Sequence, residues 1–409
     1  MADVRDAEVT IVGGGAIGCA VAHVLAGAGY RDIQVLEQGE LAGATSGQAA
    51  GLVGQVRASK ERCLLAMASV AVYARIEQET GYPADWRQTG SVRIAATPQR
   101  AAEFQALAGV ARSAGLEVEF LSTARLAELC PMLDSTRVTA ALWCPTDGYL
   151  QPHSLVTAYA RAARDQGVTF ATHTTVTGLR IIGGAVRGVH TDRGTIATDM
   201  VINAAGPWAG AVAALAGQPL PIVPVRHEYF VTRAVAGWHS DLPVLRLPDI
   251  RLYARAEGPG LLCGGWEPNG HSLDPRGVSI GQALAVAPDW EVLSGFARDF
   301  ATYAPDVTEA EVREVFRGFP AFSPDGRFIV GPVPGVRGLV MAAACNAHGV
   351  SGSAGLAGHV LDSLQPDPSP YVKSLSPSRY YPPTWDWESA RAQAQSVYQD
   401  YYSLSPVGG

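Results

Sequence analysis

The chain has 409 residues, a length that predicts two or three domains. Hydrophobic residues make up 47% and charged residues 17% of the chain, which predicts a globular protein with a large core. The net charge of −7, without any Lys/Arg-rich run, argues against nucleic acid as the main partner, and no apolar stretch of about 18 residues is present to span a membrane.

The six cysteines are scattered along the chain, without a Cys-x-x-Cys pair or an accompanying His cluster. We therefore expect no metal site, and we expect thiols in a reducing compartment. Acidic residues precede the first apolar run, where a secretory signal needs a basic flank. The sequence thus predicts a cytoplasmic protein.

The first fifty residues predict a βαβ unit. Residues 8–12 form a short apolar run, a helical pattern extends to Ala28, and residues 33–36 form a second apolar run. Between the first run and the helix lies Gly13-Gly14-Gly15-Ala16-Ile17-Gly18. Glu37 ends the second run, 19 positions after Gly18. This is the Gly-x-Gly-x-x-Gly motif in the context that binds dinucleotides.

Each glycine of this motif has a physical role. Gly13 permits a tight turn, Gly15 lets the backbone approach a pyrophosphate, and Gly18 lets the helix pack on the strand. The pyrophosphate lies at the helix N-terminus, where free N–H groups favour negative charge, and Glu37 accepts hydrogen bonds from a ribose. The motif alone does not separate FAD from NAD. The contacts predicted in this unit are Gly13, Gly15, Ala16, Ile17, Gly18, Glu37 and Gln38.

The next segment, residues 43–57, is small, polar and Gly-rich, and it leads into a helix. It is either a second cofactor-binding stretch or a flexible loop. Thr45-Ser46, followed by Ala49-Ala50-Gly51-Leu52, resembles the flavin-contacting loop of the D-amino-acid oxidase superfamily, in its dimethylglycine and sarcosine dehydrogenase branch. Six further segments resemble that family in the same order, namely residues 147–153, 201–208, 224–229, 251–255, 322–326 and 346–350.

The resemblance covers most of residues 8–364 and implies an α/β (α+β) fold of two interleaved domains. A Rossmann-like FAD-binding domain would combine residues 1–85, 148–220 and 318–365. A mainly antiparallel substrate domain would combine 86–147 and 221–317. Residues 366–409 form an aromatic and Pro-rich tail, helical near 387–402, which we expect to pack on the parent domain or a partner. The long dehydrogenases continue with a folate-binding region, and here we expect no folate-dependent step.

The resemblance also implies roles for individual residues. Val176 would meet the adenine, although a plain edge strand is the alternative. Gly349 would begin the last major helix, residues 351–364, whose N–H groups face the flavin's pyrimidine edge. The cofactor contacts implied beyond the βαβ unit are Thr45, Ser46, Ala50, Gly51, Leu52, Val176, Gly318, His348, Gly349, Val350 and Ser351.

On the substrate side, the resemblance makes His227 and Tyr253 the catalytic candidates, which would orient the amine or favour its neutral form. A purely structural role of His227 is the alternative. Arg57 and Arg255 are the predicted substrate-binding residues, and a solvated strand face is the alternative for Arg255.

Two departures from the family matter. The covalent His of the close dehydrogenases is replaced here by Gln48, and the covalent Cys of monomeric sarcosine oxidases aligns with Gly318. We therefore predict non-covalent FAD. The basic residue that many amino-acid oxidases carry in the 346–351 loop is also missing, and this loop offers only His348.

The prediction is an FAD-dependent amine oxidoreductase acting on a small secondary or tertiary amine, N-methylated by preference. Hydride passes to flavin N5, water hydrolyses the imine, and the net change is a demethylation. Electrons then pass to oxygen or another acceptor, and a homo-oligomer is compatible with the sequence. The alternatives are oxidation of a hydroxy acid or a ring C–N bond, a flavin subunit that needs a partner chain, and a nicotinamide dehydrogenase.

Overall fold

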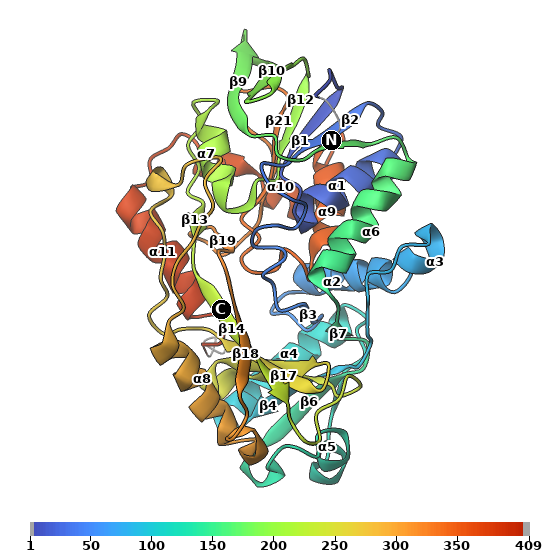
Figure 1. The fold of residues 1–409 in the computed structure, drawn as a ribbon, viewed down its shortest axis with the longest axis vertical. Helices are drawn as coiled ribbons and strands as arrows, with labels where there is room; N and C mark the ends of the chain where they lie inside the picture. The colour runs from blue at the N-terminus through green and yellow to red at the C-terminus, as the bar shows by residue number, and fades with distance from the viewer. Residues whose placement is uncertain (1–3, 404–409) are drawn as a thin grey trace.

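The computed structural model describes residues 4–403, and its six-stranded sheet has the order β20-β21-β12-β1-β2-β8 (Figure 1). Five of the strands are parallel, and β20 pairs antiparallel at one edge. The strands are β1 (Val9–Val12), β2 (Ile33–Leu36), β8 (Thr169–Ala171), β12 (Met200–Asn203), β20 (Ile329–Pro332) and β21 (Leu339–Ala343).

Both faces of this sheet are covered, because successive residues of a strand point to opposite faces. Val9 and Ile11 of β1 join the core beneath three helices, whereas Val12 joins the core on the opposite face. On the first face, α1 (Ala16–Gly27) packs against both α6 (Pro152–Asp165) and α9 (Ser353–Ser363). The opposite face carries α7 (Ala209–Ala214) and the small sheet of β9 (Val176–Ile182), β10 (Ala185–Thr191) and β11 (Gly194–Ile196).

The second large sheet has eight strands in the order β18-β14-β17-β16-β15-β4-β6-β5. Every pair is antiparallel except β15 with β4. The strands are β4 (Ser91–Ala95), β5 (Glu119–Phe120), β6 (Ala140–Cys144), β14 (His227–Ala234), β15 (Val244–Leu247), β16 (Leu252–Glu257), β17 (Gly260–Gly265) and β18 (Val312–Gly318).

Helices cover the eight-stranded sheet as well. Along α8 (Trp290–Ala301), Leu293, Phe296 and Phe300 are buried at helical spacing, and the helix packs on β14 and β17. The other helices of this part are α4 (Pro98–Ser113), which packs on β4 and β6, and α5 (Thr123–Leu129).

Two short strand pairs lie between the large sheets (Figure 1), β3 (Leu52–Val53) with β7 (Gly148–Tyr149) and β13 (Val223–Pro224) with β19 (Ala321–Phe322). The 43–57 loop leads through β3 into α2 (Lys60–Tyr73), which is followed by α3 (Ile76–Thr80). The prediction of an α/β fold with a Rossmann-like unit and a mainly antiparallel sheet is confirmed.

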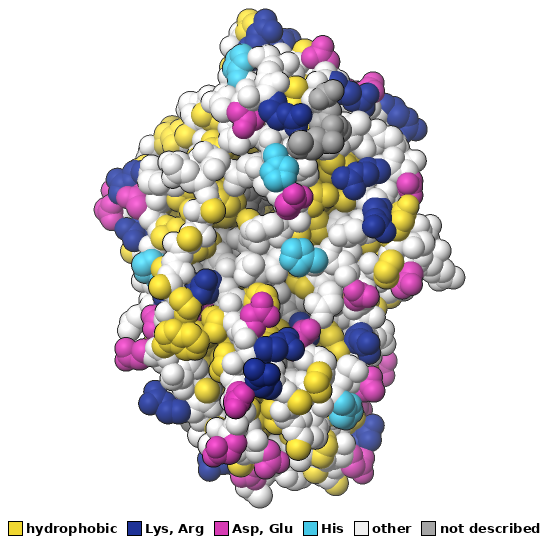
Figure 2. All heavy atoms as spheres, in the orientation of Figure 1, with side chains coloured by type: hydrophobic (Ala, Val, Ile, Leu, Met, Phe, Trp, Pro, Cys, Tyr) yellow, Lys and Arg dark blue, Asp and Glu magenta, His cyan; other side chains and the backbone are white. Residues whose placement is uncertain are grey.

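All six strands of the first sheet come from residues 1–85, 148–220 and 318–365, and the eight strands of the second come from 86–147 and 221–317, except that β18 ends one residue later, at Gly318. We propose that these two sets are the two interleaved domains. None of the helices within residues 4–403 has the length and apolar character needed to cross a lipid bilayer. On the face in Figure 2, basic and acidic side chains are interspersed.

The tail folds back on the rest of the chain. After α10 (Pro370–Ser374), α11 (Trp387–Gln399) contacts β13 and β19 along one side of the molecule (Figure 1). The Asp386 carboxylate accepts a hydrogen bond from the Ser389 N–H and caps the helix. Tyr398 is fully buried. The expected helix over 387–402 therefore ends three residues early, and the described part of the tail packs on the parent fold.

Candidate functional site

A cavity reaches from the carboxyl ends of β1 and β2 to the inner side of the eight-stranded sheet, and together with the open solvent at its mouth its empty space is about 1580 Å³. In an open parallel sheet, ligands bind at this end of the strands. The cavity wall combines the glycine-rich turn, the 42–52 loop, the start of α9, parts of the eight-stranded sheet and the tail residue Tyr401.

The glycine-rich turn at the cavity has no room for side chains at Gly13, Gly15 and Gly18. Gly13 has φ +112°, which favours glycine, and a Cβ there would overlap the Ala204 carbonyl oxygen. A Cβ at Gly18 would overlap the Gly13 carbonyl oxygen, so α1 and the turn are in direct backbone contact. Gly15 lies at the cavity, where a Cβ would come within 2.9 Å of the Ser46 hydroxyl. The turn therefore presents bare backbone to the cavity.

Glu37 is held rigidly at the end of β2. Its carboxylate accepts hydrogen bonds from the Gly14 N–H at 2.7 Å and the Gly39 N–H at 2.8 Å. Burial raises the pKa of Glu37, and these two bonds partly offset that effect. The neighbouring Gln38 side chain accepts a hydrogen bond from the Gly281 N–H at 2.9 Å, and Val176 lines the same end of the cavity.

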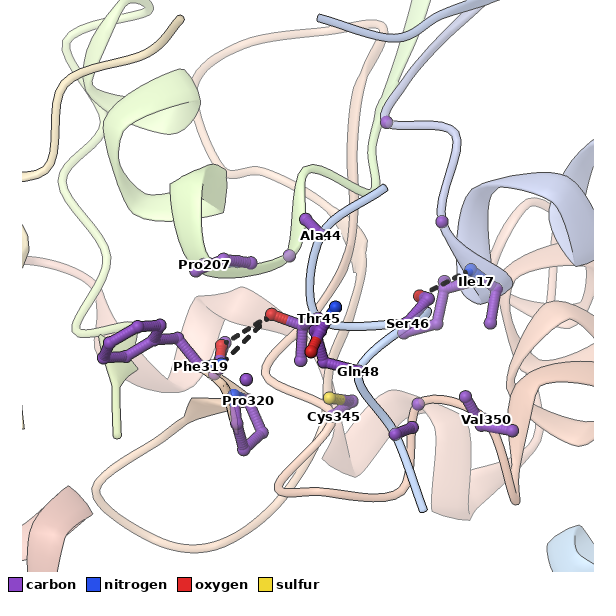
Figure 3. Close-up of a pocket in the computed structure, with 18 of the residues that line it drawn as sticks. Ile17, Ala44, Thr45, Ser46, Gln48, Pro207, Phe319, Pro320, Cys345 and Val350 are labelled. Carbon is purple, nitrogen blue, oxygen red and sulfur yellow. Dashed lines mark hydrogen bonds between the residues drawn. The ribbon is translucent and has the colours of Figure 1, made fainter. Parts of the chain in front are cut away.

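The loop after Glu37 crosses the cavity (Figure 3). The Ser46 hydroxyl accepts a hydrogen bond from the Ala16 N–H at 3.0 Å, at the start of α1. The Thr45 hydroxyl donates to the Phe319 carbonyl at 3.2 Å and accepts from the Phe319 N–H at 3.3 Å. Gln48 lines the cavity beside Gly318, where a Cβ would be 3.4 Å from the Gln48 Cβ. The two positions predicted to lack a covalent anchor are therefore neighbours.

The segment before α9 forms the opposite wall. Residues 347–351 all line the cavity, and α9 itself begins at Ser353, two residues later than predicted. Burial lowers the pKa of His348 well below its usual range, and the nearby Arg57 lowers it further. His348 is therefore neutral at neutral pH.

His227 and Tyr253 meet where the eight-stranded sheet lines the cavity, on β14 and β16. His227 Nε2 lies 2.7 Å from the Tyr253 hydroxyl, and Nδ1 lies 3.3 Å from the Tyr398 hydroxyl. The ring centroids of His227 and Trp266 are 4.8 Å apart. Burial lowers the pKa of His227 to about 4 and raises the pKa of Tyr253 well above 10. Both groups are neutral at neutral pH.

Two arginines, Arg57 and Arg246, line the same end of the cavity. Arg246, on β15, is only 6% exposed, and its Nη1 donates to the Tyr402 hydroxyl at 3.3 Å. Its Nε has no hydrogen-bond partner among residues 4–403. Arg57 Nη1 donates to the Val56 carbonyl at 3.4 Å, and burial lowers the pKa of Arg57.

Comparison with known proteins identifies the fold family. Residues 8–363 match the DAO family, described as FAD dependent oxidoreductase. The chain belongs to this family. Its cofactor is accordingly FAD, and the structure fits that cofactor, because bare glycine backbone, the Glu37 carboxylate and the segment before α9 line one continuous cavity.

Curated relatives in this family are similar over most of the chain. Mitochondrial sarcosine dehydrogenase of Homo sapiens is 32% identical over 351 residues, which cover 84% of this chain and 38% of that protein. Mitochondrial dimethylglycine dehydrogenase of Rattus norvegicus is 31% identical over 388 residues, which cover 91% of this chain and 45% of that protein. The chain therefore spans less than half the length of either relative.

Solved structures share the architecture. L-proline dehydrogenase from P. horikoshii superposes with a TM-score of 0.83 and 23% identity, covering 92% of this chain and 98% of that one. This similarity shows the fold.

All the sequence-predicted family site residues line the cavity except Gly18 and Arg255. Gly18 lies beneath the turn, in contact with Gly13. Arg255 is directed elsewhere, because its Nε donates to the Ala50 carbonyl at 2.8 Å and its Nη1 pairs with Glu257 at 2.6 Å. Arg255 therefore lies outside the cavity lining, and its role as a substrate contact stays a prediction.

Arg246, Trp266 and Tyr401 line the cavity, and Tyr398 and Tyr402 bond cavity residues, yet none of them was predicted as a site residue from the sequence. Arg246 is a lone charge inside the apolar run 244–247, and an unexplained charge in a buried strand was the available signal. Tyr398 and Tyr402 lie four positions apart, the spacing of one helix face. The pattern indicated that the tail is buried, but not which surface buries it.

Proposed function

We propose that the chain uses dissociable FAD to oxidise a secondary or tertiary amine, N-methylated by preference, to an imine that water hydrolyses to an amine and an aldehyde. The observation that supports this most is the neutral His227–Tyr253 pair, at the opposite end of the cavity from the dinucleotide-binding turn. The names of the two relatives support the substrate class, since sarcosine is a secondary and dimethylglycine a tertiary N-methylated amine.

When bound, FAD would supply the acceptor for the hydride that leaves the carbon next to the amine nitrogen. Only an amine with a free lone pair can push that hydride out, so the chain's task is to bind the neutral form. Both ring nitrogens of His227 lie against tyrosine hydroxyls, those of Tyr253 and Tyr398, so neutral His227 fixes the Tyr253 phenol beside the proposed substrate without adding charge. The charges of Arg57 and Arg246 disfavour a nearby ammonium and therefore favour proton loss from the amine.

The residues proposed to hold FAD form two groups. The first comprises the turn residues 13–18 with Glu37, Gln38 and Val176. The second comprises the 45–52 loop with Gly318 and residues 348–351. Gln48 and Gly318 stand at the two positions where the family resemblance implies a covalent flavin anchor, and neither side chain can form one, which supports a dissociable cofactor.

The test is product analysis with the purified, FAD-loaded chain. Sarcosine and dimethylglycine are each supplied anaerobically, and the visible flavin absorbance and the released formaldehyde are measured. We expect bleaching of the flavin and one formaldehyde per flavin reduced. Unchanged flavin absorbance with both substrates, and with longer N-methyl amino acids, would contradict the proposal.

The other candidate functions receive less support. No feature of the described cavity favours a hydroxy acid or a ring C–N bond over an amine. The tail, which is the docking surface in the partner-chain alternative, is buried against its own chain at Tyr398 and Tyr402. We also propose a cytoplasmic location, supported by the six free thiols, with oxygen or another acceptor taking the electrons; cell fractionation and an oxygen-consumption assay test these points.

A further inference from the structure

A row of three hydrogen bonds links the C-terminal tail to the cavity. The hydroxyl of Tyr398, on α11, lies 3.4 Å from the Glu267 backbone nitrogen and 3.3 Å from His227 Nδ1. On the other side of the imidazole ring, His227 Nε2 lies 2.7 Å from the Tyr253 hydroxyl. Glu267 follows β17, His227 begins β14 and Tyr253 belongs to β16. The row therefore joins the tail and the eight-stranded sheet, and it ends at a residue that lines the cavity.

The direction of these hydrogen bonds follows from the atoms that they join. The Glu267 amide N–H can only donate, so the Tyr398 oxygen accepts that bond. Tyr398 is fully buried and its hydroxyl has no further partner among residues 4–403, so its proton goes to His227 Nδ1. A neutral imidazole with a bare Nδ1 carries its proton on Nε2 and donates it to the Tyr253 oxygen. The opposite direction would leave the Tyr398 proton buried without an acceptor, which is costly.

The packing of the tail holds Tyr398 in this place. Its ring meets Phe322 edge-on with centroids 5.7 Å apart and lies 5.0 Å from the Trp266 ring. One helical turn before Tyr398, the Gln395 side chain accepts a hydrogen bond from the Ser272 hydroxyl at 2.7 Å. Tyr398 cannot turn away unless α11 unpacks, so it fixes the orientation of the imidazole that it bonds.

This direction decides which form of an amine the Tyr253 hydroxyl can bind. Because the Tyr253 oxygen accepts the Nε2–H, its own proton is left for an acceptor in the cavity, and the hydroxyl forms no other hydrogen bond among residues 4–403. A neutral amine accepts such a proton with its lone pair, whereas an ammonium ion has no lone pair to offer. The row starts at the Glu267 amide, which takes up no proton, so it orients groups and does not carry the substrate's proton away.

We propose that Tyr398 is a positioning residue of the active site, because its hydroxyl holds the His227 ring with Nε2–H toward Tyr253 and the Tyr253 hydroxyl is thereby free to donate to the neutral amine. The inference rests on the proposed function and adds a residue of the tail to the site. Tyr398 lies outside the cavity lining and acts through His227. The hydrogen bond from Tyr253 selects the neutral amine on binding and is given up when the lone pair moves toward carbon.

Nitrogen NMR of the FAD-loaded full chain tests the direction without turnover. The histidine rings are labelled with ¹⁵N, because the chemical shift of an imidazole nitrogen separates a bare atom from a protonated one. The His227 signals are those that disappear in His227→Gln. We expect a single tautomer with a protonated Nε2 and a bare Nδ1. A proton on Nδ1 would overturn the inference.

Tyr398→Phe removes only the hydroxyl that bonds His227 Nδ1. We expect the Nδ1 signal to lose the shift that an accepted hydrogen bond gives it. We also expect kcat for dimethylglycine to fall about tenfold with little change in KM, because the ring is then held from one side only. Tyr381→Phe is the matched control, since this tail tyrosine has a buried hydroxyl without a partner among residues 4–403, and it is expected to change neither readout. His227 signals that are the same in both variants would overturn the inference.

The positioning role and the proposed function fail separately. If the His227 signals behave as expected but the chain oxidises neither sarcosine nor dimethylglycine, Tyr398 positions His227 and the proposed function is wrong. If the chain oxidises these amines while Tyr398→Phe keeps the full kcat, the function holds and the positioning role of Tyr398 is wrong.

Discussion

Replacement of Gly18 by alanine tests whether contact between α1 and the glycine-rich turn sets the affinity for FAD. Gly27 in the same helix provides the matched control, because a Cβ there meets only the Gln166 side chain, at 3.7 Å. An alanine in place of a helical glycine stabilises the helix by up to about 1 kcal/mol. We therefore expect Gly27→Ala to be neutral or slightly stabilising.

At Gly18 the same methyl group meets backbone. Its Cβ would lie well under 3.0 Å from the Gly13 carbonyl oxygen and 3.5 Å from the Ala204 Cβ. A carbonyl oxygen of the turn cannot rotate away as a side chain would, so α1 has to move off the turn. Overpacking of this kind costs about 1–3 kcal/mol, which the gain in helix propensity offsets only in part. The expected net loss of stability is about 0.5–2 kcal/mol.

The displacement also moves the N–H groups at the start of α1 away from the bare backbone of Gly15, so we expect the Kd for FAD to rise about 10- to 100-fold. Urea unfolding of the apoproteins measures the first effect, and quenching of FAD fluorescence during titration measures the second. If the Gly18→Ala protein has the same stability and the same FAD affinity as the Gly27→Ala protein, this contact does not position the turn.

Three further outcomes follow from the site. Acid precipitation is expected to release all flavin into the supernatant, since neither Gln48 nor Gly318 can form a covalent bond to it, and yellow that stays in the pellet would contradict this. Tyr253→Phe is expected to lower kcat about 10- to 100-fold with little change in KM. Tyr303→Phe, which changes a buried tyrosine outside the cavity lining, is expected to leave both unchanged. The pKa of His227 is near 4 in the folded and near 6.5 in the unfolded apoprotein, so the unfolded chain binds the proton first and the free energy of unfolding falls as the pH drops below 6.5. Between pH 7 and pH 5 the apoprotein is expected to lose about 2 kcal/mol more than a His227→Gln apoprotein. Urea unfolding that shows the same loss of stability in both proteins would contradict this.

The cofactor half of the fold was predictable because its signals are local. The apolar runs, the glycine turn and Glu37 are contiguous in the sequence, and the structure places β1, α1 and β2 within one or two residues of the predicted limits. The chemistry of this half depends on backbone geometry, which glycine spacing encodes directly.

The substrate half was predictable only through resemblance, and incompletely. His227 and Tyr253 are 26 positions apart and meet because β14 and β16 both pair with β17, a register that no local pattern encodes. The same limit applies to the arginines, since Arg246 lines the cavity and Arg255, the residue predicted from the sequence, does not. Both are buried arginines on adjacent strands. Only the three-dimensional structure shows that the Arg255 guanidinium bonds the Ala50 carbonyl and pairs with the Glu257 carboxylate.

The two cavity arginines and the proposed amine chemistry fit each other electrostatically. A unit charge about 6 Å away, at an effective dielectric constant of about 20, contributes about 3 kcal/mol, equivalent to about two pKa units. Arg57 and Arg246 both line the cavity, and each guanidinium opposes an ammonium bound there. The proposed amine substrate therefore loses its proton more easily in the cavity than in water, and the neutral amine is the form that can release a hydride.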